Sequence, residues 1–217
     1  MDGLAWTPFD AISEEQREQL EAFEEQLLQF NRRVNLVSPE TEADFRTRHL
    51  LHCLTLTVRG IPDGCTIVDW GTGGGLPAIP LAICFPEVTV VGVDSVGKKS
   101  RAVRTIARRL GLDNCFTWNG RADEWPGEPH YSVSRATAPL ATLWRWHRRV
   151  AVDLEAPPGD DDWGPGLLAL KGGDLSDEIA ALRSADSSVT VERLRLEPML
   201  GRNGIFGDKE IVAVRGA

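Results

Sequence analysis

The stretch "IVDWGTGGGLPAIPLAI", residues 67–83, places four glycines and two prolines between two apolar runs. Glycine loses more conformational freedom on folding than any other residue, so a dense group of glycines is expected where the backbone must turn or be approached closely. The apolar run before the glycines has the composition of a short buried strand, and the run after them, entered through Pro77, has that of a helix. The stretch therefore predicts a strand, a glycine turn and a helix.

The same alternation of strand and helix continues beyond this stretch. The periodicity and the turn signals predict strands over residues 65–70, 88–94, 115–119, 131–136 and 166–173, and helices over 76–85, 98–111, 140–154 and 175–183. The last two predicted strands, 188–196 and 209–215, leave no room for a crossover helix and are expected to be an antiparallel pair. The sequence thus predicts an α/β fold with a doubly wound, mostly parallel, seven-stranded sheet and a C-terminal antiparallel hairpin.

Two helices are predicted before the first strand. Residues 13–31 have apolar residues at helical spacing, and Ser13 followed by Gln16 has the form of a capping box. A second helix is expected over residues 40–58, after Pro39. We expect residues 1–60 to be a helical extension of a Rossmann-like domain over 61–217, with both parts in one compact unit.

Composition narrows the class of protein. The 217 residues are 42% hydrophobic and 26% charged, which is typical of a globular protein. No apolar run approaches the roughly 20 residues of a membrane span, and the N-terminus is acidic where a signal peptide is basic, so we expect a cytoplasmic protein with no membrane partner. We also expect a monomer. The four cysteines are scattered, which favours reduced thiols and no metal. The acidic stretch 155–166 is expected to be a solvated loop of low order.

Charge is unevenly distributed along the chain. The net charge is −8, yet residues 98–109 carry six basic residues and no acidic one, and Arg32 and Arg33 form a further basic pair. A solvated helix face accounts for any one such patch. Several basic patches on one protein are nevertheless compatible with a polyanionic partner.

The glycine turn does not match the common nucleotide motifs. Leu76 stands where a dinucleotide fingerprint has its third glycine, and no lysine followed by serine or threonine completes a phosphate loop. What remains is Asp69 on the strand, the bare backbone of Gly71, Gly73 and Gly75, and Asp94 at the end of the second strand. Asp94 is placed to accept the ribose hydroxyls of a nucleoside, and a helix N-terminus favours a ligand carboxylate. These requirements describe S-adenosylmethionine.

The chain resembles the RsmG or GidB family, the guanine-N7 methyltransferases of small-subunit ribosomal RNA. Seven segments carry the resemblance in order: "NRRVNLVS" (31–38), "RHLLHC" (48–53), "VDWGTGGGLPAIPLAI" (68–83), "VDSVGKKSRAV" (93–103), "GRADEW" (120–125), "VSRATAPL" (133–140) and "LALKGG" (168–173). The resemblance implies a class I methyltransferase fold, S-adenosylmethionine as cofactor, S-adenosylhomocysteine as product, and 16S ribosomal RNA of the small subunit as partner. It also implies cofactor contacts at Leu76 in the loop and at Ala122 and Asp123 beside the adenine.

The chemistry implied by the family needs little acid–base help. The N7 of guanine has a free lone pair, so transfer depends mainly on proximity and orientation. Arg135 and Lys171, at the carboxyl ends of the fourth and fifth predicted strands, are the expected positioning residues, and Arg135 is also an expected cofactor contact. Asn35 either meets the substrate or caps a helix or turn.

The chain departs from the usual family pattern at four places. His52 and Cys53 replace an aspartate–serine pair, Ala102 replaces a bulky residue, the tail "KEIVAVRGA" (209–217) is less basic than usual, and the acidic stretch 155–163 resembles an insertion. The alternatives to the family activity are a relative directed to another RNA site or to a small molecule, and a binding module without transfer.

Overall fold

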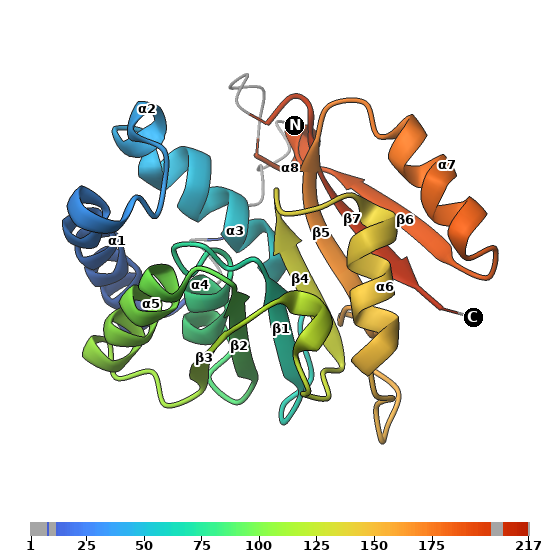
Figure 1. Ribbon diagram of the computed structural model, residues 1–217, viewed down its shortest axis with the longest axis horizontal. Coiled ribbons are helices and arrows are strands. Elements are labelled where there is room, and N and C mark those ends of the chain that lie inside the picture. Colours follow the sequence, from blue (N-terminus) through green and yellow to red (C-terminus); the bar gives the residue numbers. More distant parts are fainter. Residues whose placement is uncertain (1–7, 9–11, 201–205, 217) are drawn as a thin grey trace, which may run out of the picture.

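A seven-stranded sheet forms the centre of the molecule in the computed structural model (Figure 1). The structure describes residues 8, 12–200 and 206–216, so the first residues of the expected N-terminal extension, 1–7 and 9–11, lie outside the described part. The strands in chain order are β1 (Thr66–Trp70), β2 (Thr89–Asp94), β3 (Cys115–Asn119), β4 (Tyr131–Arg135), β5 (Gly166–Gly172), β6 (Thr190–Arg195) and β7 (Lys209–Arg215). Their spatial order is β3-β2-β1-β4-β5-β7-β6.

The pairing of the strands confirms the predicted fold class. Strands β1 to β5 pair in parallel, and β7 runs antiparallel to both β5 and β6. Chain order reverses on either side of β1, where β2 lies on one side and β4 on the other. In a doubly wound sheet, ligands bind beyond the carboxyl ends of the strands at this switch point. The topology therefore directs attention to the ends of β1, β2 and β4.

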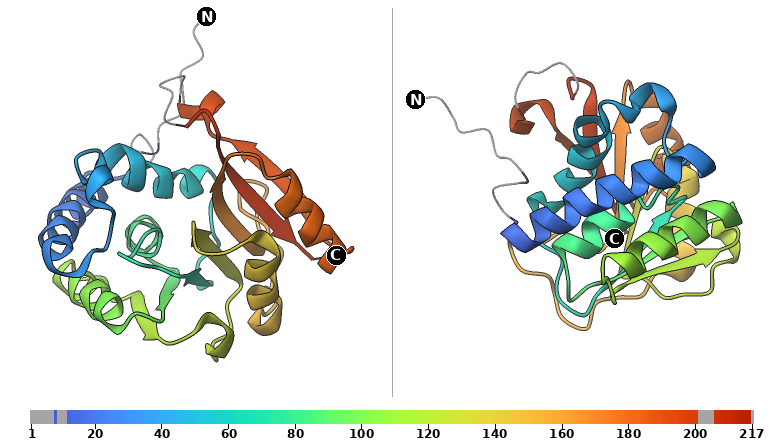
Figure 2. Two further views of the ribbon diagram at one scale, coloured as in Figure 1. Left: turned by 45° about the horizontal axis from the view of Figure 1, so that its top comes forward. Right: turned by 90° about the vertical axis from the view of Figure 1, so that its left-hand side faces the viewer.

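Helices cover both faces of the sheet (Figure 2). On one face lie α1 (Glu14–Val34), α4 (Ala78–Cys84) and α5 (Gly97–Arg109), and on the other lie α6 (Leu140–Val150) and α7 (Ser176–Ala185). Successive residues of β1 alternate between the two layers: Ile67 belongs to the first core, and Val68 and Trp70 belong to the second. The short elements are α2 (Pro39–Glu42), η2 (Arg46–Leu51), α3 (His52–Leu54), η3 (Thr55–Val58), η4 (Ala122–Glu124) and α8 (Glu197–Leu200). Across the described residues, no helix has the length and apolar character that crossing a membrane requires.

The two predicted N-terminal helices have different outcomes. The Ser13 capping box is confirmed, since the Ser13 hydroxyl accepts from the Gln16 backbone and the Gln16 side chain accepts from the Ser13 backbone. The single helix expected over 40–58 is wrong: α2, a π-helix (η2), α3 and a 3-10 turn (η3) occupy the segment. Thr55 and Thr57 donate their hydroxyls to backbone carbonyls three residues back, an alternative to regular helix bonding.

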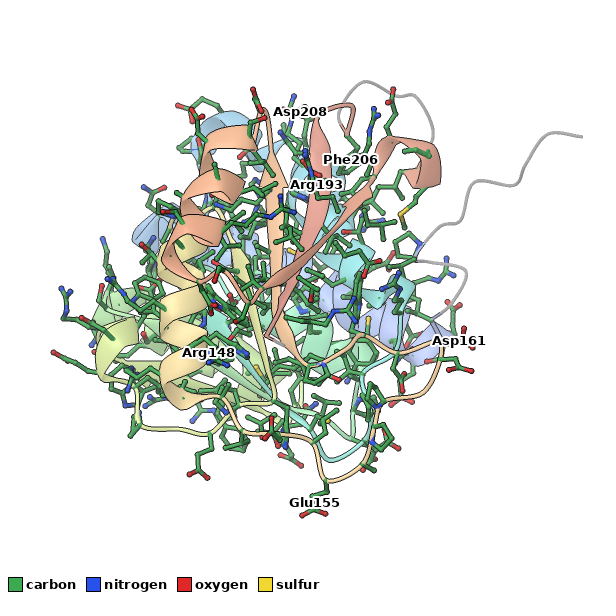
Figure 3. All side chains as sticks on the ribbon, turned by 90° about the vertical axis from the view of Figure 1, so that its right-hand side faces the viewer. Arg148, Glu155, Asp161, Arg193, Phe206 and Asp208 are labelled. Atoms are coloured by element: carbon green, nitrogen blue, oxygen red, sulfur yellow. The ribbon has the colours of Figure 1, made fainter. Side chains whose placement is uncertain are left out.

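The acidic stretch before β5 is anchored, so the expectation of a loop of low order is wrong. Trp163 is 1% exposed, its indole nitrogen donates to the Leu56 carbonyl at 2.7 Å, and its own carbonyl accepts from the Tyr131 hydroxyl at 2.8 Å. Glu155 and Asp161 of this stretch stay exposed, and Figure 3 shows Glu155 at the opposite end of the molecule from Asp208. The loop enters β5 at its amino end, away from the edge where a ligand is expected.

The buried anchor predicts a large loss of stability on truncation. Trp163→Ala is expected to lower the free energy of unfolding by about 3–5 kcal/mol, because it removes a buried indole and its hydrogen bond. Tyr131→Phe removes one buried hydroxyl donor and is expected to cost about 1 kcal/mol. Urea unfolding followed by circular dichroism measures both, with the exposed Glu155→Ala as control. A Trp163→Ala protein as stable as the control would contradict the anchoring role.

Candidate functional site

The glycine turn begins at the carboxyl end of β1 and leads into α4. The backbone N–H groups of Gly71 and Thr72 both donate to the Val93 carbonyl of β2, at 2.9 and 3.0 Å. Gly71, Gly73 and Gly75 have φ angles of 72°, 56° and 83°, in the left-handed region that favours glycine. Alternating left-handed residues make the chain turn sharply over the ends of β1 and β2.

The glycines serve different purposes along the turn. A Cβ on Gly71 would meet the Thr137 side chain at 2.3 Å, and one on Gly75 would meet Ile79 at 2.8 Å. At Gly74 the nearest groups are Leu36 and Leu27 of the N-terminal segment. A Cβ on Gly73 would have no side chain within 4 Å. Close packing of protein against protein thus accounts for three of the glycines, and Gly73 alone of these four faces open space.

The carboxylate of Asp94, the last residue of β2, is hydrogen-bonded to the glycine turn. Its Oδ2 accepts the Gly73 N–H at 3.0 Å, and its Oδ1 accepts the Val96 N–H at 2.8 Å, just before α5. An ionised carboxylate offers about four acceptor positions, so each oxygen keeps the capacity for a further donor. Asp94 can therefore accept hydroxyl groups from a ligand while it fixes the glycine turn.

A cavity of about 310 Å³ lies directly beside Asp94. This volume is at the lower end of the roughly 300–1,000 Å³ of small-molecule sites. The lining residues are Gly71, Val93, Asp94, Ser95, Gly120, Arg121, Ala122, Asp123, Thr137 and Trp146. Four of the residues predicted from the sequence as cofactor contacts therefore meet here: Gly71, Asp94, Ala122 and Asp123. They come from the ends of β1 and β2 and from η4, the turn after β3.

The cavity offers groups of the kinds that an adenosyl ligand requires. Asp94 supplies acceptors for ribose hydroxyls, Ala122 supplies a small side chain and its backbone, and Trp146 supplies an aromatic wall. Asp123 is exposed and paired with Arg121 at 3.2 Å. The residues present fit S-adenosylmethionine.

Other residues predicted as cofactor contacts lie outside the cavity lining. Asp69 is fully buried on β1, where its Oδ2 accepts the Ala78 N–H of α4 at 3.2 Å and burial raises its pKa to about 7. Leu76 is 2% exposed and belongs to the core. Asp69 ties the first strand to the helix after the turn, and direct contact of Asp69, Gly73, Gly75 or Leu76 with the cofactor stays a prediction.

Arg135 ends β4 at the same edge of the sheet. Its Nη1 donates to the Nδ1 of His49 at 2.7 Å, and its Nε is buried without a hydrogen-bond partner. The next residue, Ala136, has a φ of 56°, which is uncommon for a residue with a Cβ and marks a tight turn. Thr137 then donates its hydroxyl to the Trp70 carbonyl at 2.9 Å. The β4 loop is in this way pinned to β1 beside the glycine turn.

Lys171 and Asn35 are the other residues for which the sequence predicts a role toward the substrate. Lys171 is 10% exposed at its side chain, and its ammonium donates to the Ala138 carbonyl at 2.9 Å and to Glu178 at 2.8 Å. It therefore ties the β4 loop to α7. Asn35 is exposed, has a φ of 55° and is the C-terminal cap of α1. Of its two predicted roles, the structure therefore shows the capping role. A contact of Lys171 or Asn35 with substrate stays a prediction.

Sequence reasoning missed several residues of the site. Asn31 is the buried side-chain cap, because its Oδ1 accepts the N–H groups of Leu36 and Val37 at 2.6 and 2.9 Å. Thr137 and Trp146 line the cavity, and His49 contacts Arg135. Thr137 lies inside "VSRATAPL", one of the segments that resemble the family, so the resemblance could have pointed to it. His49 lies inside "RHLLHC", and Trp146 stands beside the basic Arg145, but neither position by itself indicates a contact with the site.

His52 and Cys53, which depart from the family pattern, lie in the interior of the protein. Both side chains are buried, burial lowers the pKa of His52 to about 3, and burial raises the pKa of Cys53 to about 12. A neutral, buried imidazole and a neutral, buried thiol are packing groups in this fold.

Comparison with known sequences gives close relatives over almost the whole chain. A protein from Salinibacter ruber named ribosomal RNA small subunit methyltransferase G is 77% identical over 215 residues, which cover 99% of this chain and 100% of the relative. A protein of the same name from Christiangramia forsetii is 39% identical over 178 residues, 82% of each chain.

Comparison with solved structures supports the fold. Fibrillarin from Aeropyrum pernix, solved in complex with natively bound S-adenosyl-L-methionine, has a TM-score of 0.55 and 16% identity over 76% of this chain and 74% of that chain. At this identity the likeness shows the fold, which is that of the class I methyltransferases. The family model for the rRNA small subunit methyltransferase G, GidB, matches residues 16–203. The family model and the two relatives each match most of the length of this chain. The chain therefore belongs to the GidB family.

Proposed function

We propose that this protein transfers the methyl group of S-adenosylmethionine to the N7 of a guanine in small-subunit ribosomal RNA. The observation that carries the proposal is the meeting of Gly71, Asp94, Ala122 and Asp123 around one cavity at the switch point of the sheet, in a chain of the GidB family. The relatives bear the name of a ribosomal RNA methyltransferase. A monomeric state and a cytoplasmic location stay predictions.

The cofactor would be held mainly by backbone and by one carboxylate. When bound, it supplies a methyl group on a positively charged sulfur. Asp94 would accept the ribose hydroxyls, and the η4 turn with Ala122 and Asp123 would flank the adenine. The glycine turn, fixed by Asp94 and by packing against Thr137, would present a preorganised backbone to the cofactor.

The reaction requires the protein to position the acceptor and does not require a general base. Because the guanine N7 has a free lone pair, the residues of this chain would have to orient the acceptor and would not have to remove a proton. Arg135, at the end of β4 beside the turn, is the basic group available to orient the acceptor or its phosphates. Lys171 would act through the β4 loop, whose Ala138 carbonyl it holds.

The basic residues of α5 and of the last turn of α1, called the α1–α5 face here, support an RNA partner despite the net charge of −8 and the six glutamates in the earlier turns of α1. The two helices lie side by side in the right-hand view of Figure 2, and Arg109 bridges them by donating to Gln26 at 2.6 Å. Arg32, Arg33 and Arg109 line a hollow of about 410 Å³ between these helices. The exposed basic residues of this face are Arg32, Arg33, Lys98, Arg101, Arg104, Arg108 and Arg109. Exposed cations gathered in this way suit contacts with phosphates.

Methyl transfer from labelled S-adenosylmethionine tests the function. The acceptors to compare are small ribosomal subunits, free 16S ribosomal RNA and small guanine-containing molecules, followed by mass mapping of the modified nucleotide. We expect N7-methylguanine in the ribosomal RNA. Transfer to another position or to a small molecule would favour a redirected relative, and cofactor binding without any transfer would favour a binding module.

Asp94→Asn is expected to raise the dissociation constant for S-adenosylmethionine at least about tenfold, or roughly 1.4 kcal/mol. The reason is that an amide oxygen cannot replace both carboxylate oxygens as acceptors. Isothermal titration calorimetry measures the effect. Asp113→Asn is the matched control, since Asp113 is an exposed carboxylate outside this cavity. Equal affinity in the folded Asp94 variant would refute the assignment.

Arg135→Ala is expected to reduce kcat/KM for methylation of small subunits on the order of 100-fold, because a misplaced acceptor loses the in-line geometry. Lys171→Ala is expected to reduce kcat/KM about tenfold by releasing the β4 loop. Steady-state transfer assays measure both, with Arg183→Ala on α7 as control. Transfer at the original rate by the Arg135→Ala, Lys171→Ala double variant would overturn this mechanism.

The double variant Arg32→Gln, Arg33→Gln is expected to weaken RNA binding and to reduce the slope of log K against log salt by about 2, because each lost phosphate contact removes about one unit. Filter binding with 16S ribosomal RNA between about 50 and about 200 mM salt measures the slope. The double variant Arg148→Gln, Arg183→Gln carries the same change of charge on α6 and α7. An equal slope change in both variants would show that the α1–α5 face has no special role.

A further inference from the structure

His49 lies between Arg135 and Thr41 and contacts both. Its Nδ1 is 2.7 Å from Nη1 of Arg135, and its Nε2 is 2.7 Å from Oγ1 of Thr41. His49 lies within the π-helix Arg46–Leu51, and Arg135 lies at the carboxyl end of β4. π-Helices are rare in proteins, and those that occur are frequently found at functional sites. Two segments that are 86 residues apart in the chain thus meet at the edge of the cofactor site.

The hydrogen bonds define the tautomer of the imidazole. A guanidinium can only donate, so Nδ1 of His49 must accept from Arg135. The Thr41 hydroxyl donates to the Ser38 carbonyl at 3.1 Å, so its oxygen is free to accept from Nε2–H of His49. The chain of donors therefore runs from Arg135 through His49 and Thr41 to the backbone of Ser38. It requires a neutral imidazole with its proton on Nε2.

The electrostatic surroundings keep this imidazole neutral. Burial, with the nearby charges of Arg135 and Arg48, lowers the pKa of His49 to about 4. At neutral pH the ring therefore presents an acceptor to Arg135 instead of a second positive charge.

Arg135 has few other restraints. Among the described residues, its guanidinium makes one hydrogen bond, the bond to His49, and its Nε is buried without a partner. The following residue, Ala136, begins an exposed turn. Without His49, no hydrogen bond from the described residues would fix the orientation of the Arg135 guanidinium.

We propose that His49 is a positioning residue, which holds the guanidinium of Arg135 through Nδ1 in the orientation used for methyl transfer. The proposal rests on the proposed function, because it assigns Arg135 to the acceptor. Thr41 sets the tautomer that makes this possible, and the π-helix brings the imidazole to the end of β4.

Two substitutions separate the two nitrogen atoms of His49. In His49→Asn the amide oxygen can occupy the place of Nδ1 and accept from Arg135, but the contact with Thr41 is lost. In His49→Gln the amide reaches the place of Nε2, and the acceptor for Arg135 is lost. We expect His49→Asn to keep kcat for ribosomal RNA methylation within about fivefold, and His49→Gln and His49→Ala to lose on the order of 10–100-fold, with KM changed less than kcat.

A double-mutant cycle tests whether His49 acts through Arg135. We expect His49→Gln to have little further effect in an Arg135→Ala background, because the group that it positions is gone. Additive losses in the cycle, or equal activities of the Asn and Gln variants, would overturn the proposal. Circular dichroism of each variant excludes a loss of folding as the cause.

Magnetic resonance tests the contact without activity. We expect long-range proton–nitrogen correlations to show His49 as the Nε2–H tautomer at neutral pH. We also expect slowly exchanging guanidinium protons of Arg135 in the unmodified protein and in His49→Asn, but not in His49→Gln. The opposite tautomer, or rapid exchange in all three proteins, would overturn the proposal. If the unmodified protein fails to methylate ribosomal RNA but shows these signals, the proposed function fails and the contact stands.

Discussion

The carboxylate of Asp94 holds the arrangement on which the site depends. One oxygen accepts the Gly73 N–H in the glycine turn, and the other accepts the Val96 N–H before α5. The turn is fixed from the other side by Thr137, which occupies the space where Gly71 has no Cβ and donates to the Trp70 carbonyl. The ends of β1, β2 and β4 are thereby locked together, and the cavity lies in the angle between them.

Around this fixed centre, polar groups connect the site to the rest of the molecule. Lys171 joins the β4 loop to α7, and His49 joins Arg135 to the N-terminal segment. Buried polar groups are costly unless they are paired, so such connections hold their partners in one geometry. The contact of His49 with Arg135 thus connects the N-terminal segment to the end of β4.

The two wrong predictions of local structure have different causes. Residues 40–58 have helical periodicity, yet the hydroxyls of Thr55 and Thr57 donate to backbone carbonyls three residues back, and the segment forms several short helical pieces. The stretch 155–166 is acidic, yet one tryptophan is buried under it and bonded to Leu56. In the acidic stretch a contact with the distant Leu56 outweighed local composition, and no window of sequence contains that contact.

The sequence by itself determined the order of strands and helices, the antiparallel C-terminal pair, the glycine turn and the importance of Asp94. These features depend on local backbone preferences and on the period of apolar residues, both of which are written in short segments. Only the tertiary structure decided which glycine faces open space, that Trp146 and Thr137 line the cavity, and that His49 contacts Arg135. Those features depend on side chains that come from separate elements, and their meeting is fixed by how the sheet and its helices pack.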